Sequence, residues 1–254
     1  MSRAERLEAL RARIGACAAA PARPALTFGE ESLDAALPGG GLAVGSHEVC
    51  AGGADLPQEA AMVQLAAYVL GRGGGPVVWA LPRLTLFPPA LAEAGLCPSR
   101  VIFAEGGREE DVLAVAEEAL RHGGLGGVAC EASRLSLTAS RRLQLAGEAG
   151  GTACLVLRRW RRGAPPTAGT ACATRWVVTA RPSDAPSGLP QACFALDLTR
   201  CRGGRPGAWD ARLERDDEPG AAGAALRLRV AAALADRAAG AGTDEKTGRA
   251  GVAA

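Results

Sequence analysis

The sequence contains few lysine, histidine and aromatic residues, and these shortages limit the kinds of site it can form. Lys246 is the single lysine among 29 basic residues, and aromatic residues make up 4% of the chain. The chain has two histidines and eight cysteines, but no two cysteines have the C-x-x-C spacing of common zinc sites. We therefore expect no metal ion and no other cofactor. The apolar surroundings of four cysteines favour a role as small core residues: Cys50, Cys130, Cys154 and Cys193.

Long hydrophobic runs and a strong excess of one charge are also missing. No apolar run approaches the roughly 20 residues needed to span a bilayer, and the amino-terminal residues are charged from Arg3 to Arg13. The formal net charge is +2, so any contact with nucleic acid has to be local. These features indicate a reduced, soluble, cytoplasmic protein without a membrane segment.

A regular alternation of secondary structure fills most of the chain. With 254 residues, 48% of them hydrophobic, we expect one main domain. Apolar strands alternate with amphipathic helices, which predicts an α/β fold with a mostly parallel twisted sheet and helices on both faces. The predicted strands are 46–50, 76–81, 101–105, 126–131 and 152–157. One predicted helix begins near residue 58, and three further helices are predicted at 87–94, 109–121 and 138–149.

The pattern changes after Trp160. Strands at 174–179, 193–199 and 208–214 follow one another without helices between them, which predicts an antiparallel C-terminal extension of the sheet. We expect one further helix near 226–234, where alanine and leucine dominate. The expected domain organisation is a core at 25–235, preceded by an amphipathic helix and linker at 1–24 and followed by a disordered tail at 236–254.

The amino-terminal helix has an apolar stripe. Leu7, Leu10, Ile14 and Cys17 share one face, and arginine and glutamate residues lie opposite. Two interpretations remain open. The helix packs on its own domain, or it docks on a partner through Leu7, Leu10 and Ile14.

The stretch 37–69 has the order strand, small-residue loop and helix that P-loop ATPases use to hold phosphates. A P-loop also needs a Lys-Ser/Thr pair at its end, and either Pro57-Gln58 or Gln58-Glu59 stands there instead. Gly52 and Gly53 are retained. Asp55 is predicted to be the helix N-cap, with Gln58 at the third helical position, so a carboxylate would take the place of a phosphate.

The order of elements resembles the RecA-like core, with Glu131 at the position of the Walker B acid. More closely, the chain resembles the ImuA proteins, also called SulA-like, of bacterial damage-inducible mutagenesis cassettes. The stretches that carry this resemblance are 73–87, 111–124, 134–144, 157–162 and 199–207. Together they span most of residues 37–214.

The resemblance implies a role in the SOS response to DNA damage without catalysis. It implies error-prone translesion synthesis beside ImuB, a catalytically inactive relative of Y-family polymerases, and an alternative DnaE-type polymerase. RecA itself is a further partner that it suggests. A Walker B acid holds Mg²⁺ or activates a water, and this is one interpretation of Glu131. Because the lysine and the hydroxyl of a P-loop are missing, the favoured interpretation is a salt bridge, with Arg134 as the expected partner.

A basic cluster with one aromatic residue follows the fifth predicted strand: Arg158, Arg159, Trp160, Arg161 and Arg162. In RecA-like folds the loop after this strand faces single-stranded DNA. Arginines suit phosphates and an indole can stack on a base, so DNA contact is one interpretation. Contact with a protein partner and a purely structural role remain open beside it.

Two other functions are compatible with the same sequence. The first is a SulA-like inhibitor of cell division that binds a tubulin-like division protein. The second is an atypical RecA-like ATPase, against which the missing lysine and the acidic residues Asp55 and Glu59 argue.

Overall fold

The computed structural model describes residues 26–160, 169–183, 192–215 and 226–231. Within these ranges the chain forms one nine-stranded sheet in the order β3-β2-β4-β5-β1-β6-β7-β8-β9. Neighbouring strands in the part β3-β2-β4-β5-β1-β6 pair in parallel. Beyond β6, each of β7, β8 and β9 pairs antiparallel with the strand before it. The predicted α/β class and its antiparallel extension are confirmed.

The first eight strands lie close to their predicted positions. Their bounds are β1 Gly45–Ala51, β2 Val77–Leu81, β3 Val101–Glu105, β4 Gly127–Glu131, β5 Ala153–Arg158, β6 Thr174–Arg181, β7 Cys193–Cys201, β8 Gly207–Arg215 and β9 Leu226–Ala231. Every residue of β1, β2, β4 and β5 is buried, because this part of the sheet is covered on both faces. In β1 the buried residues include the polar side chains of Ser46, His47 and Glu48.

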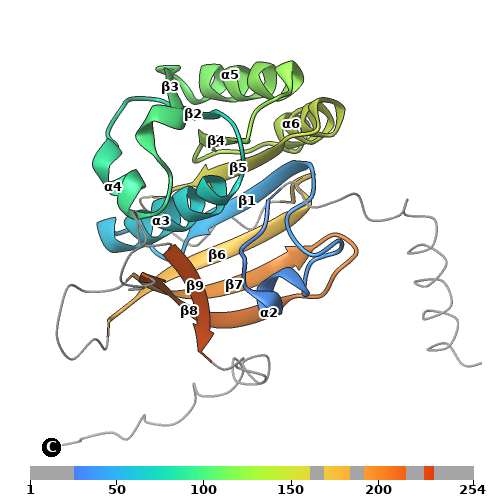
Figure 1. Ribbon diagram of the computed structural model, residues 1–254. Coiled ribbons are helices and arrows are strands. Elements are labelled where there is room, and N and C mark those ends of the chain that lie inside the picture. The colour runs from blue at the N-terminus through green and yellow to red at the C-terminus, as the bar shows by residue number, and fades with distance from the viewer. Residues whose placement is uncertain (1–25, 161–168, 184–191, 216–225, 232–254) are drawn as a thin grey trace, which may run out of the picture.

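Helices cover both faces of the parallel half of the sheet (Figure 1). The helices are α2 Glu31–Asp34, α3 Leu56–Arg72, α4 Pro88–Glu93, the 3₁₀ helix η1 Pro98–Arg100, α5 Glu109–His122 and α6 Leu137–Gly150. Helix α3 packs on one hydrophobic cluster, and α5 and α6 pack together on a second cluster at the opposite face. None of the helices in the described ranges is long and apolar enough to cross a membrane.

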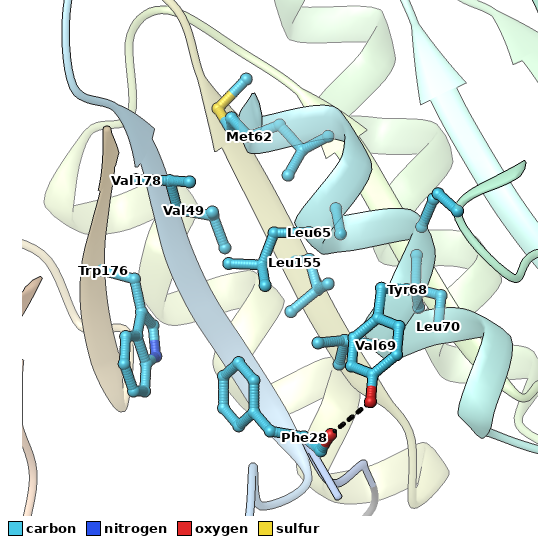
Figure 2. Packing of buried hydrophobic residues seen from close by; sticks show 14 of the residues in the cluster. Phe28, Val49, Met62, Leu65, Tyr68, Val69, Leu70, Leu155, Trp176 and Val178 are labelled. Atoms are coloured by element: carbon cyan, nitrogen blue, oxygen red, sulfur yellow. Dashed lines mark hydrogen bonds between the residues drawn. The ribbon is translucent and has the colours of Figure 1, made fainter. Parts of the chain in front are cut away.

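The α3 cluster joins segments that are far apart in the sequence (Figure 2). The hydroxyl of Tyr68 on α3 donates to the carbonyl of Phe28 at 2.9 Å and accepts from the amide of Leu228 on β9 at 2.9 Å. The Phe28 ring in turn lies 5.0 Å from the Trp176 ring on β6, measured between centroids. One tyrosine thus ties the start of the core and its last strand to α3.

The helix predicted near 226–234 is wrong, because residues 226–231 form strand β9. The sequence there alternates Leu226, Arg227, Leu228, Arg229 and Val230, which is the two-residue period of a strand. Leu228 is buried against the core, and β9 pairs antiparallel with β8. The alanines that follow had favoured a helix in the sequence analysis.

Two other expectations have different outcomes. Of the four cysteines expected in the core, three are buried, whereas Cys193 is half-exposed at the start of β7. The amino-terminal helix, with Leu7, Leu10 and Ile14, and the tail from 236 lie outside the described residues, and the domain boundaries stay predictions.

Candidate functional site

The loop between β1 and α3 packs tightly against β6. The amide of Gly52 donates to the carbonyl of Val178 at 2.6 Å. A Cβ atom on Gly52 would lie 2.2 Å from Oγ1 and 2.8 Å from Cα of Thr179, so only glycine fits there. The need for glycine at this position therefore has a structural cause in the packing of Thr179.

The amino-terminus of α3 is capped by the side chain of Asp55, the residue directly before the helix. Oδ1 of Asp55 accepts from the amide of Gln58 at 3.1 Å, and Pro57 lies in the first turn, which confirms the predicted N-cap. The side chain of Gln58 does not turn back to the helix cap as in a capping box. Its Oε1 instead accepts from the amide of Ala180 on β6 at 2.7 Å. The Asp55 carboxylate thus stands at the helix terminus, where it disfavours an approaching anion.

A buried ionic group lies beside this loop, at the carboxyl ends of β4 and β5. Oε2 of Glu131 lies 3.0 Å from Nη2 of Arg159, and Nη1 of Arg159 lies 3.6 Å from Oε2 of Glu59 on α3. Oε1 of Glu131 accepts from Nε1 of Trp79 at 3.1 Å. We call Glu59, Glu131, Arg159 and Trp79 the Glu131 cluster. The salt bridge expected between Glu131 and Arg134 is wrong, since Arg159 is the partner of Glu131.

Burial and the neighbouring groups have opposing effects on the pKa of Glu131. Burial raises the pKa of Glu131, and this effect outweighs the Arg159 guanidinium and the Trp79 hydrogen bond, which both lower the pKa. The negative charge of Glu59 adds to the rise in the pKa of Glu131. Arg159 and Trp79 therefore reduce the rise in the pKa of Glu131 but do not reverse it.

A cavity of about 300 Å³ opens in front of the cluster. Its lining combines three carboxylates with two guanidiniums, those of Glu59, Glu109, Glu131, Arg83 and Arg159. Glu109 is already engaged, because its two carboxylate oxygens accept from the amides of Ser133 and Arg134 at 2.9 and 3.2 Å. Across the described ranges, no group of three or more His, Cys, Asp or Glu side chains is arranged to hold a metal ion.

A second ionic group lies on the opposite face of the sheet, around Glu48 of β1. Glu48 is fully buried, with Arg158 Nη1 at 3.1 Å and Arg175 Nε at 3.0 Å from its Oε2. The hydroxyl of Thr170 donates to its Oε1. Burial raises the pKa of Glu48, but the hydrogen bonds from Arg175, Thr170 and Arg158 outweigh burial and hold the pKa below its usual value. We call these four residues the Glu48 cluster, which the sequence analysis did not detect.

The basic cluster after β5 is thus largely internal where it is described. The Arg158 side chain is 4% exposed and belongs to the Glu48 cluster, while Arg159 belongs to the Glu131 cluster. Trp160 packs against the α3 core cluster. Arg161 and Arg162 lie outside the described residues, so a contact with DNA or a partner stays a hypothesis for these two.

The strand order, with a parallel half followed by antiparallel strands, is that of a RecA-like α/β protein. In this protein Asp55 caps the helix that follows the loop after β1, and Arg159 pairs with Glu131 beside that loop. No family model matches the sequence. The chain is 40% identical over 200 residues to Protein ImuA from two strains of Caulobacter vibrioides, NA1000 / CB15N and ATCC 19089, covering 73% of this chain and 82% of the relative. The chain therefore belongs to the ImuA family.

Among solved structures, the chain is similar to SulA from Pseudomonas aeruginosa. The similarity has 24% sequence identity and a TM-score of 0.40, and it covers 45% of this chain and 98% of SulA. At that level it carries no argument about function.

Proposed function

We propose that this protein is a non-catalytic adaptor in the SOS response to DNA damage, which supports error-prone translesion synthesis with ImuB and an alternative DnaE-type polymerase. The observation that carries the proposal is the salt bridge between Arg159 and Glu131, at the position where an ATPase needs a free acid for Mg²⁺. Membership of the ImuA family supports the pathway. RecA and single-stranded DNA are further proposed partners, and the protein would act in the cytoplasm.

The chemistry of phosphoryl transfer explains why we propose no catalysis. Phosphoryl transfer relies on positioned cations that neutralise the charge on the phosphates. The loop has no lysine, and the carboxylate of Asp55 caps the helix where a phosphate would bind. The guanidinium of Arg159, beside Glu131, is shared between two glutamates. A nucleotide would therefore have to compete with bonds that the folded chain already makes.

Two measurements test the proposal. In a pull-down with purified ImuB, we expect the full chain to retain ImuB. Isothermal titration with ATP and Mg²⁺ should give no saturable heat, with RecA as the positive control. Failure to retain ImuB would contradict the adaptor role. Saturable ATP binding would contradict the loss of the nucleotide site, and hydrolysis of that ATP would contradict the absence of catalysis.

A measurement in cells separates the adaptor from the division inhibitor. Deleting the gene should lower the frequency of damage-induced mutation, and overexpression should leave cell length unchanged. Filamentous cells with an unchanged mutation frequency would replace the adaptor by a SulA-like inhibitor.

A further inference from the structure

Large apolar side chains are exposed where α3 begins and where the chain enters α4. Leu56 is 80% exposed, Phe87 is 69% exposed and Leu84 is 44% exposed. Single exposed apolar residues are common, but a contiguous group of this kind marks a surface that another segment covers. Leu56 begins α3, whereas Leu84 and Phe87 lie in the segment just before α4, and α3 packs against α4 (Figure 1).

These elements form a groove of about 430 Å³. Its apolar lining comprises Leu56, Ala60, Val63, Leu86, Phe87 and Leu91. The α3 members of this lining recur at intervals of three and four residues, so they form one stripe along the helix. Such a stripe beside a second short helix is the shape that accepts a third, amphipathic helix.

The chain contains one segment with a matching pattern that the described structure does not account for. Residues 2–19 place Leu7, Leu10, Ile14 and Cys17 on one face, at alternating steps of three and four. Ten residues of helix from Leu7 to Cys17 rise by about 15 Å. The stripe from Leu56 to Gln64 on α3 rises by about 12 Å, so the two apolar surfaces have similar lengths.

The point where the described chain begins is also suitable. The Leu26 side chain lies beside the end of α3, because a Cβ atom on Gly73 would be 2.8 Å from it. The distance along α3 from Gly73 back to Gln64 is about 14 Å. Residues 20–25 can extend over about 20 Å, so the linker is long enough to bring Cys17 to Gln64 within one chain.

We propose that residues 2–19 of this chain pack as a helix into the α3–α4 groove, with Cys17 near Gln64 and Leu7 near Leu56. This contact covers Leu56 and Phe87. It also places a removable segment over a surface next to Glu59 and Arg159, both of which line the groove. The inference does not depend on the adaptor role.

The native Cys17 allows a direct test in the full chain. Gln64→Cys is introduced in a Cys97→Ser background, because Cys97 is an exposed thiol. The protein is oxidised with glutathione disulfide, and the products are analysed by non-reducing electrophoresis and peptide mass spectrometry. The matched control is Leu145→Cys, an accessible position on α6 at the other face of the sheet.

In the Gln64→Cys variant we expect a disulfide within a monomer that joins Cys17 to the introduced thiol. It should form at least tenfold faster than the disulfide that joins Cys17 to the introduced thiol of the Leu145→Cys control. A disulfide that appears only between two chains would overturn the proposal in favour of a second copy as the occupant. Equal rates in the two variants would also overturn it and leave the groove free for another protein.

A second measurement does not rely on a disulfide. Leu10→Glu and Ile14→Glu together should release the helix and raise the fluorescence of a dye that binds exposed apolar surface. Adding Phe87→Ser and Leu56→Ser should remove most of that rise. No rise in the first variant would contradict the contact, because both substitutions lie outside the described core and leave its packing intact.

Discussion

Arg158 and Arg159 are consecutive in the chain, yet they pair with carboxylates on opposite faces of the sheet. Arg158 contacts Glu48 on the side of α5 and α6, and Arg159 contacts Glu131 on the side of α3. Successive side chains of a strand point to opposite faces, so the end of β5 delivers one cation to each. The basic cluster that suggested a DNA-binding surface thus begins with two arginines that pair with carboxylates inside the fold.

Replacing Arg159 with alanine should lower the free energy of unfolding by roughly 2 kcal/mol. Breaking a fully buried pair costs about 3–5 kcal/mol, and the value is smaller here because 24% of the Arg159 side chain is exposed. Urea unfolding at pH 7 measures the change. The double variant Arg159→Ala, Glu131→Gln should recover part of the loss, and no recovery would show that Glu131 is not the group left unpaired.

Replacing Glu48 with alanine should cost about 3–5 kcal/mol, because Arg158 and Arg175 then lose the buried carboxylate that they share. The matched control is Arg212→Ala, which breaks the exposed pair with Glu214 and should cost less than about 1 kcal/mol. Thermal unfolding of both variants gives the comparison. Similar losses in the two would contradict a special role for the Glu48 cluster.

His47 should make the protein less stable as the pH falls from 6.5 towards 4. Nε2 of His47 donates to the carbonyl of Ala43 at 2.9 Å, so Nδ1 accepts from the hydroxyl of Thr174, also at 2.9 Å. Burial lowers the pKa of His47 to about 4 in the folded protein. The unfolded chain therefore takes up the proton first, and folding loses about 3 kcal/mol over the whole window.

The measurement is urea unfolding at pH 7.5, 6.5 and 5.5 for the wild type and for His47→Gln. The free energy of unfolding should fall more steeply with acidification in the wild type than in His47→Gln, which does not titrate in this range. Parallel pH profiles would show that folding does not lower the pKa of His47.

Gly52→Ala should destabilise the protein by about 1–3 kcal/mol, because the new Cβ atom collides with the backbone and hydroxyl of Thr179. Gly74→Ala is the matched control, since a Cβ atom there has nothing within 4 Å. Thermal unfolding compares the two variants. Equal stability would mean that β6 can move away, and that the glycine is retained for another reason.

If the loop after β5 binds single-stranded DNA, Arg161 and Arg162 are the residues to replace, because Arg158 and Arg159 are engaged inside the fold. Arg161→Ala with Arg162→Ala should weaken binding and lower the slope of log affinity against log salt by about 1.4. Arg212→Ala with Arg229→Ala removes two exposed arginines elsewhere and serves as the control. Fluorescence anisotropy with a labelled oligonucleotide measures both, and equal effects would exclude a specific contact.

The strands up to β8 and the helices α3, α4, α5 and α6 were predictable because their patterns are strong. The short helices α2 and η1, of four and three residues, carry no such pattern. Apolar runs indicated the buried strands, and the order Asp55, Pro57 and Gln58 indicated the start of α3. Strand β9 was not predicted because its alternation of leucine and arginine is short and stands before an alanine-rich stretch. The alanine content favours a helix, whereas the two-residue alternation indicates the strand.

The ionic partners were harder to predict because they depend on the order of strands. Glu48 meets Arg158 and Arg175 because β1 lies between β5 and β6, although the two arginines are 110 and 127 positions away. Glu131 and Arg134 are near neighbours in sequence, which favoured the wrong pair. A prediction that combined the RecA-like strand order with the pleat of the strands could have found the Glu48 cluster.

The Glu48 cluster also limits how this protein can change over evolution. The Glu48 carboxylate on β1 is shared by Arg158 of β5 and Arg175 of β6, the two strands that flank β1. Losing Glu48 alone removes the counter-charge of two cations, and losing one arginine alone leaves a carboxylate partly unmatched. Related proteins should therefore keep Glu48, Arg158 and Arg175 together or replace all three together. Residues on exposed strands, by contrast, can be substituted one at a time.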